Sequence, residues 1–400
     1  MNEENGEIRL SSISIVGNRE SGIMWPRALS NLVSRPTRYL MLSAKRASRG
    51  LGAPFGYAPY PPVIFLVVNN RCNLLCRMCD VGWANLNGQQ PGQTDSTFSR
   101  NLMTRSQLEI KDWVRLIDDV ARFKPLIAIT STEPLLYNDI VELIHHCHKM
   151  GLKVQVTTNG FLLERFVEPF LRNRLDILSV SIDGPPDVHD RIRGVKGAFE
   201  KAMKAIDQVM KRREGEAPLV EINYTICDLN FDRLVETLSC VKCDRLMFSH
   251  LNFVTEEMMK LHNARCKYSV TPSGLREVRL EAVDLDRLWS QIQGVKASQT
   301  AFPVKFSPEL SRQELEVFYR RPLQFLNGHM RCNAIWSAGQ ILADGSLTGS
   351  TRCFDTARLG NIRQQAFTEL WNGPMMREFR KYLRQAGGAF PACSRCCGLL

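Results

Sequence analysis

Three cysteines stand close together in the segment Cys72-Asn-Leu-Leu-Cys76-Arg-Met-Cys79. Three residues separate the first pair, two separate the second pair, and no fourth thiol follows nearby. Structural zinc sites usually combine C-x2-C units with a distant second pair of ligands. Three thiolates at this spacing can instead wrap around a four-iron–four-sulfur cubane and bind three of its irons. The remaining iron would keep an open coordination position, which a catalytic centre requires.

The three-cysteine loop directly follows a short apolar run, residues 63–68, that is rich in β-branched side chains. Such a run is typical of a strand that is buried on both faces. Similar runs alternate with helical patterns and are found at residues 126–129, 154–157, 177–182, 219–226 and 246–248. This alternation predicts an α/β fold, a partial (β/α)6 barrel with parallel strands. Parallel folds of this type place active sites at the carboxyl ends of the strands, where the cysteine loop lies.

The cysteine loop on the first strand of a βα barrel resembles that of the radical S-adenosylmethionine enzymes. The resemblance makes Cys72, Cys76 and Cys79 the catalytic and metal-binding residues. It implies that the open iron binds the methionine part of S-adenosylmethionine and that reduction of the cluster cleaves the sulfonium. The 5′-deoxyadenosyl radical formed in this way would remove a hydrogen atom from an unactivated C–H bond of the substrate.

Further segments resemble motifs of the same family, each after another strand. Residues 130–134 stand where the family usually has Gly-Gly-Glu-Pro, and this chain keeps Glu133 and Pro134 but replaces both glycines. The resemblance implies that Thr132 and Glu133 meet the methionine amino group. It also implies that Ser181 contacts the cofactor and that Arg193 pairs with the methionine carboxylate, since a planar guanidinium can bind a carboxylate through two hydrogen bonds.

The resemblance implies three further cofactor contacts and one turn that lines the site. Asn223 and His250 fall where the family contacts ribose and adenine. Met78 stands where the family commonly has an aromatic side chain near adenine, and its sulfur can make a similar contact. The turn at residues 157–160, Thr-Thr-Asn-Gly, is common in the family and is expected to line the same site.

A second group of cysteines lies near the C-terminus: Cys332, Cys353, Cys393, Cys396 and Cys397. A predicted β-hairpin lies between the first two. This order resembles the shortened SPASM domain found behind many radical enzymes, in which four cysteines bind one auxiliary four-iron–four-sulfur cluster. The implied ligands are Cys332, Cys353, Cys393 and Cys396, with Cys397 as an alternative to Cys396. Zinc bound by the same thiolates stays open as another interpretation.

The chain has 400 residues and a formal net charge of +11 at pH 7, which favours anionic partners. No stretch approaches the ~18 apolar residues needed to cross a bilayer. The first twenty residues show no apolar block of the kind found in secretory signals. We therefore expect a cytoplasmic protein. The basic residues between positions 21 and 60 are compatible with peripheral contact with a membrane, with binding of an anionic substrate, or with a solvated strap packed on the main domain.

The sequence divides into four parts. We expect a basic N-terminal segment and linker at 1–60, a radical S-adenosylmethionine core at 61–255, connecting helices and loops at 256–329, and a small cysteine-rich α+β domain at 330–400. The polar residues 84–101 are expected to form a long surface loop near the cysteines.

The leading hypothesis is a radical enzyme with two four-iron–four-sulfur clusters and S-adenosylmethionine as cofactors. Its expected partners are a peptide or a small sugar-like or lipid-like metabolite as substrate, and an electron donor such as flavodoxin or ferredoxin. An RNA-modifying radical enzyme is one alternative, but no interleaved aromatic platform is visible, so nucleic acid is not an expected partner. The other alternative is a zinc-stabilised βα binding protein without catalysis.

Overall fold

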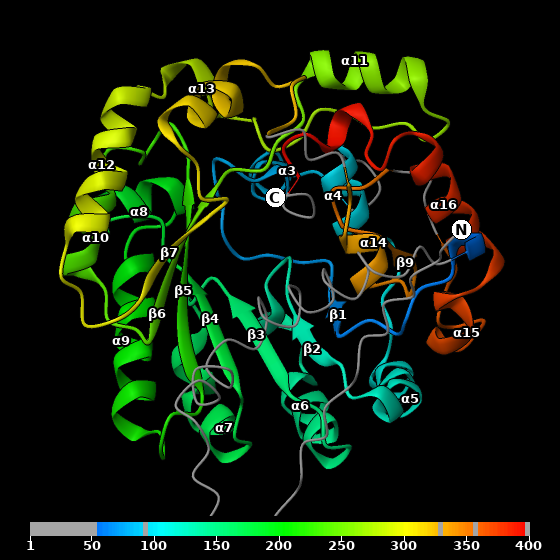
Figure 1. The fold of residues 1–400 in the computed structure, drawn as a ribbon. Coiled ribbons are helices and arrows are strands. Elements are labelled where there is room, and N and C mark those ends of the chain that lie inside the picture. The colour runs from blue at the N-terminus through cyan, green and yellow to red at the C-terminus, as the bar shows by residue number, and fades with distance from the viewer. Residues whose placement is uncertain (1–53, 91–94, 327–330, 355–358, 397–400) are drawn as a thin grey trace, which may run out of the picture.

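The computed structural model describes residues 54–90, 95–326, 331–354 and 359–396. Its centre is a nine-stranded sheet with the strand order β7-β6-β5-β4-β3-β2-β1-β8-β9 (Figure 1). The strands are β1 (Val63–Leu66), β2 (Leu126–Ile129), β3 (Val154–Thr158), β4 (Ile177–Ser181), β5 (Leu219–Ile226), β6 (Arg245–His250), β7 (Val304–Ser307), β8 (Ala338–Ile341) and β9 (Leu347–Thr348). All neighbouring pairs from β7 to β8 are parallel, and the pair of β8 with β9 is antiparallel.

Helices fill the connections between the strands and continue into the C-terminal part. They are α3 (Asp80–Leu86), α4 (Thr97–Leu102), α5 (Ile110–Val120), α6 (Ile140–Lys149), α7 (Val167–Arg172), α8 (Pro186–Arg193), α9 (Ala198–Arg212), α10 (Leu234–Cys240), α11 (Glu256–Arg265), α12 (Leu285–Ala297), α13 (Arg312–Arg320), α14 (Ala334–Ser337), α15 (Phe367–Trp371) and α16 (Pro374–Gln385). Within the described ranges, none of these helices has both the length and the apolar character that a membrane span needs.

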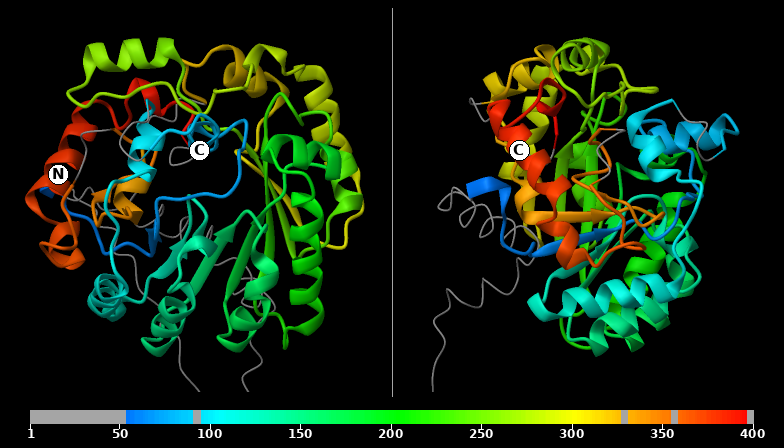
Figure 2. Two further views of the ribbon diagram at one scale, coloured as in Figure 1. Left: turned by 180° about the vertical axis from the view of Figure 1, so that it is seen from behind. Right: turned by 90° about the vertical axis from the view of Figure 1, so that its right-hand side faces the viewer.

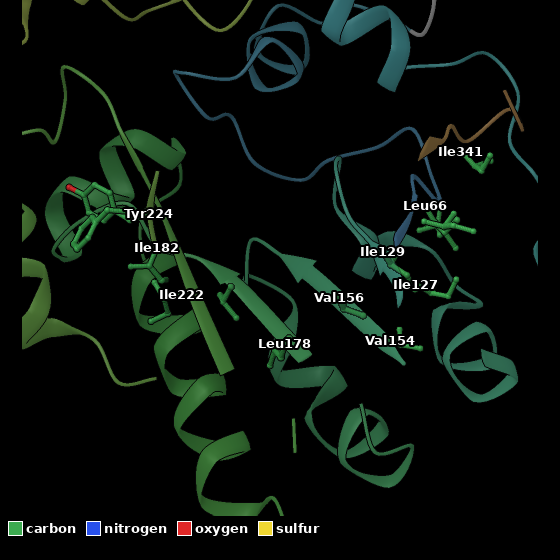
Figure 3. Close-up of a cluster of buried hydrophobic side chains, with 14 of the residues drawn as sticks. Leu66, Ile127, Ile129, Val154, Val156, Leu178, Ile182, Ile222, Tyr224 and Ile341 are labelled. Atoms are coloured by element: carbon green, nitrogen blue, oxygen red, sulfur yellow. The ribbon is translucent and has the colours of Figure 1, made fainter. Parts of the chain in front are cut away.

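One face of the sheet packs against the connecting helices through an apolar core, part of which is drawn in Figure 3. Fully buried strand residues in this core include Leu66, Ile127, Val154, Leu178 and Ile222. Helix residues that pack in the same core include Trp113, Ile117, Leu143, Phe170 and Val209. Burial of each such side chain contributes roughly 1.5–3 kcal/mol. The core therefore fixes the strands, and with them the loops that follow their carboxyl ends.

The predicted α/β fold with a mostly parallel sheet is confirmed, and each of the six predicted strands is present. The sequence pattern does not predict that the sheet continues on both sides. β7 lies in a segment expected to hold helices and loops, and β8 of the predicted hairpin pairs in parallel with β1. Both strands have four residues, and such short strands carry little periodicity. The division into domains stays a prediction.

Two local predictions need correction or fall outside the described residues. The segment 84–101 is not only loop, because it contains the end of α3 and most of α4. Most of the basic N-terminal segment at 1–60 lies outside the described residues.

The C-terminal part packs against the start of the described chain (Figure 2). Arg380 on α16 is fully buried, and its Nη1 donates to the backbone carbonyls of Gly56 at 3.2 Å and Trp371 at 2.9 Å. Its Nε donates to the carbonyl of Ile335 at 3.0 Å. Burial lowers the pKa of Arg380 to about 9. One buried arginine therefore joins the segment before β1 to the segment before β8.

Candidate active site

A cavity of about 360 Å³ lies where the carboxyl ends of the parallel strands meet. The loop after β1 contributes the three cysteines of the predicted cluster motif. The loops after β2 and β6 contribute residues 130–132 and 251–252, and the end of β3 with the residue after it contributes 157–159. β4 and β5 contribute one residue each near their ends. The structure therefore brings residues that are up to 280 positions apart in the sequence, Cys72 and Arg352, onto one cavity.

The cysteine loop is held by backbone pairing with the end of α8. The Leu75 amide donates to the carbonyl of Arg193 at 3.1 Å, and the Arg77 amide donates to the carbonyl of Ile192 at 2.9 Å. Gly194 follows with φ of +71°, and a Cβ there would lie 2.8 Å from the Leu75 carbonyl oxygen. Only glycine accepts both the left-handed conformation and this close approach.

The thiols of the loop lie in a setting that disfavours a free thiolate. Burial raises the pKa of Cys76 to about 11, and Arg193 opposes this rise with its Nη1 3.7 Å from the Cys76 sulfur. Arg193 also forms a buried ion pair of 2.5 Å with Asp183. Burial likewise raises the pKa values of Cys72 and Cys79. Bound metal would supply the positive charge that these thiolates need.

The three thiols lie around the cavity and not about one point. Among the described residues, no three His, Cys, Asp or Glu side chains are close enough to hold a single metal ion. A zinc ion needs ligands that converge to about 2.0–2.3 Å from one centre. An all-thiol donor set spread around a cavity suits a cluster of several metal atoms better. The residues present therefore fit an iron–sulfur cluster.

Glu133 lies behind the cavity wall and is not among the residues that line it. Its fully buried carboxylate accepts hydrogen bonds from the Leu135 amide at 3.0 Å, the Thr158 hydroxyl at 2.7 Å and the Asn159 amide at 2.8 Å. Burial raises its pKa, although these hydrogen bonds oppose the shift. Glu133 thus joins the loops after β2 and β3, and its contact with a methionine amino group stays a prediction.

The loop that carries Thr132 has an unusual backbone. Ser131 has φ of +72°, in the left-handed region, where the family motif has glycine. This conformation costs a residue with a side chain roughly 1–2 kcal/mol. The Thr132 hydroxyl donates to the carbonyl of Asn69 at 3.0 Å, and Thr132 lines the cavity. Contacts such as this hydrogen bond therefore hold the loop in a conformation that glycine would adopt without strain.

The other predicted cofactor residues divide into two groups. Met78, Ser181 and Arg193 line the cavity. Asn223 pairs in register with Ser181 on the neighbouring strand, but it does not line the cavity. His250 also lies away from the cavity: it is 2% exposed, and its Nδ1 is 2.8 Å from the Tyr319 hydroxyl. The predicted roles of these residues in binding stay predictions.

The burial of His250 predicts a pH-dependent stability. Burial lowers its pKa to about 3, so below its ordinary pKa of about 6.5 the unfolded chain takes up a proton that the folded chain does not. Folding stability is therefore lost as the pH falls. From pH 7 to 5.5, wild type should lose about 1 kcal/mol more than His250→Gln in urea unfolding of the iron-free protein. The exposed His145 provides the control, and His145→Gln should keep the wild-type pH slope.

The four predicted auxiliary cysteines lie in the C-terminal part and are partly exposed. Burial of its sulfur raises the pKa of Cys393 to about 12, and the nearby Cys332 adds to the rise. The Cys332 amide donates to the Gly388 carbonyl at 2.8 Å, which fixes its backbone. Cys397, the alternative ligand, lies outside the described residues.

The sequence analysis missed several residues of the cavity wall. Thr225, Asn252, Phe98 and Arg352 line the cavity, and none belongs to a motif recognised in the sequence. Arg352 directly precedes Cys353, one of the predicted auxiliary cysteines. Its position beside a predicted metal ligand was the sequence signal that could have identified Arg352, because the groups around a metal ligand commonly support the site.

Known proteins resemble this chain over between about half and nearly all of its length. Fe-coproporphyrin III synthase of Methanosarcina barkeri is 28% identical over 78% of this chain and 73% of the relative. PqqA peptide cyclase of Ruegeria pomeroyi is 28% identical over 46% of this chain and 45% of the relative. The crystal structure of Streptococcus suis SuiB bound to precursor peptide SuiA shares the fold, with a TM-score of 0.56, 15% identity, and coverage of 97% of this chain and 80% of that chain.

Two family models match separate parts of the chain. Residues 66–241 match the Radical SAM superfamily, in agreement with the cysteine loop and the parallel strands around the cavity. Residues 332–397 match SPASM, described as an iron-sulfur cluster-binding domain, and contain the C-terminal cysteines. The chain therefore contains a Radical SAM domain followed by a C-terminal SPASM domain, and it is an enzyme with iron–sulfur clusters and S-adenosylmethionine as cofactor.

Proposed function

We propose that this enzyme uses S-adenosylmethionine, bound beside Cys72, Cys76 and Cys79, to remove a hydrogen atom from a peptide or a small metabolite. The observation that carries the proposal is the position of these three thiols on one cavity with Arg193 and the loops after β2 and β3. When bound and reduced, a cluster with one open iron supplies the electron that splits the sulfonium and yields the 5′-deoxyadenosyl radical. The electron would come from a donor such as flavodoxin or ferredoxin.

The residues of the cavity wall would position the cofactor and exclude water. Met78 is buried among apolar side chains that include Leu251 and Ile192, and it offers an apolar surface next to the cysteine loop. Ser181 adds a hydroxyl on the same wall. The Arg193 Nε is buried without a hydrogen-bond partner in the structure, which supports a role in binding the methionine carboxylate.

The C-terminal cysteines would hold a second cluster. We propose Cys332, Cys353, Cys393 and Cys396 as its ligands, with electron transfer or substrate positioning as its purpose. Support comes from the proximity of Cys393 to Cys332 and from the SPASM match over these residues. Four protein ligands would leave this cluster without an open position, so it would not compete for S-adenosylmethionine.

Two substrate classes have support. A peptide is supported by the likeness to PqqA peptide cyclase and to SuiB in complex with its precursor peptide. A carboxylate-bearing tetrapyrrole is supported by the longer match to Fe-coproporphyrin III synthase, which covers 78% of this chain. Both substrates would be compatible with the net charge of +11, since each can carry carboxylates.

Anaerobic reconstitution with iron and sulfide tests the proposed function. The protein should bind about eight irons and, with dithionite, should release 5′-deoxyadenosine from S-adenosylmethionine. Deuterium from a labelled peptide or coproporphyrin should then appear in the 5′-deoxyadenosine, and the class that transfers deuterium is the substrate class. An iron-loaded protein that releases no 5′-deoxyadenosine would contradict the proposal.

A further inference from the structure

Arg352 enters the cavity from the C-terminal cysteine segment. Its guanidinium carbon lies 4.1 Å from the centre of the Phe98 ring, and both side chains line the cavity. This stacking holds the planar guanidinium in place without using its N–H groups. Burial raises the pKa of the Cys79 thiol, and the Arg352 charge opposes that rise, so the guanidinium lies near the three-cysteine loop.

Part of the hydrogen-bonding capacity of Arg352 is unused among the described residues. Its Nη1 is buried and has no hydrogen-bond partner. No ion pair among the described residues includes Arg352. A buried donor without an acceptor, and a charge without a counter-charge, both cost free energy. Such groups in a cavity wall indicate a ligand that supplies the missing acceptor.

The neighbouring arginines are different. Arg193, which also lines the cavity, already pairs with Asp183 at 2.5 Å and contacts the Cys76 sulfur. Arg276 pairs with the buried Asp80 at 3.1 Å. In the described cavity lining there is no aspartate or glutamate that could neutralise Arg352. Arg352 therefore carries a positive charge at the cavity that no described carboxylate of the lining compensates.

We propose that Arg352 binds a carboxylate of the ligand that occupies this cavity. The proposal rests on the proposed function and adds the chemistry of the substrate: it carries an acidic group that is placed beside the three-cysteine loop. A guanidinium suits this task because its fork can donate two parallel hydrogen bonds to one carboxylate. The carboxylate belongs either to the substrate or to the methionine part of S-adenosylmethionine, and two measurements distinguish these sources.

The first measurement compares S-adenosylmethionine with its decarboxylated analogue in equilibrium dialysis against reconstituted protein. If the methionine carboxylate is the ligand, Arg352→Gln should weaken binding of S-adenosylmethionine about 10- to 100-fold and leave binding of the analogue unchanged. Unchanged binding of both compounds excludes the methionine carboxylate and leaves the substrate carboxylate, which the second measurement tests. Arg377→Gln is the matched control, because Arg377 makes a similar contact of 4.1 Å with Tyr57 outside the cavity.

The second measurement uses coproporphyrin III and its tetramethyl ester, which lacks free carboxylates, in the presence of saturating S-adenosylmethionine. If Arg352 binds a substrate carboxylate, Arg352→Gln should weaken binding of the acid about 10- to 100-fold without changing the weaker binding of the ester. Arg352→Lys should restore part of the affinity, since it keeps the charge but not the fork. Equal iron content in all variants shows that they fold alike.

The proposal is overturned by either of two results, provided that Arg352→Gln binds S-adenosylmethionine as well as wild type does. In the first, wild type binds the acid and its ester equally well. In the second, wild type prefers the acid and Arg352→Gln shows the same preference. Both measurements read binding and do not depend on turnover. Failure of the proposed function would appear separately, as wild-type protein that binds both compounds but releases no 5′-deoxyadenosine.

Discussion

Replacement of Cys76 by alanine is expected to lower the release of 5′-deoxyadenosine by about 10³-fold or more. Cys76 is 6% exposed, and the Arg193 guanidinium is its cationic neighbour within the protein at 3.7 Å. A Cβ added to Gly82 would lie 2.5 Å from the Cys76 amide nitrogen, so the backbone around Cys76 is tightly packed. Another ligand therefore cannot move into the position of the Cys76 sulfur. The measurement is product release from reconstituted protein under dithionite, normalised to protein.

Two other cysteine variants serve as controls for this experiment. Cys393→Ala should lose irons of the auxiliary site but still release 5′-deoxyadenosine, because Cys393 is not in the cavity lining. Cys147→Ala removes a fully buried thiol of α6 and should keep both the iron content and the release. Retained release by Cys76→Ala, or an equal loss in Cys147→Ala, would show that the three-cysteine loop does not hold the catalytic cluster.

Replacement of Arg395 by methionine is expected to lower the free energy of unfolding by about 1–3 kcal/mol. Arg395 is fully buried, and burial lowers its pKa to about 10. It donates to the backbone carbonyls of Phe318, Gln324, Ser394, Val317 and Arg321. Methionine fills much of the volume but leaves these carbonyls without their donor. Urea unfolding of the iron-free protein measures the effect.

The same variant should also affect the auxiliary site. Arg395 lies directly before Cys396, and its contacts join the cysteine segment to the carboxyl end of α13. We expect Arg395→Met to bind fewer irons but to retain release of 5′-deoxyadenosine. Arg312→Met is the control, because the partly exposed Arg312 pairs with Asp286 on the surface and should contribute less than about 0.5 kcal/mol. Equal stability of the two variants would contradict the structural role of Arg395.

Local sequence patterns determined the strands and the place of the cysteine loop. Runs of apolar, β-branched residues predict buried parallel strands, and residues that directly follow such strands must lie at one edge of the sheet. For this reason the positions of Cys72, Cys76, Cys79 and Ser181 on one cavity could be expected from the sequence. The alternation of strands and helices places them at this edge, and the pairing of the cysteine loop with the end of α8 then fixes the loop.

Only the tertiary structure determines which side chains face the cavity and which distant segments contribute to the site. Glu133 follows β2, and His250 is the last residue of β6. The Glu133 carboxylate connects the loops after β2 and β3, and His250 is buried against Tyr319. β8 and Arg352 reach the site from the C-terminal part, because β8 pairs with β1. Such placements depend on side-chain direction and on contacts between residues far apart in the chain, and periodicity within a short window records neither.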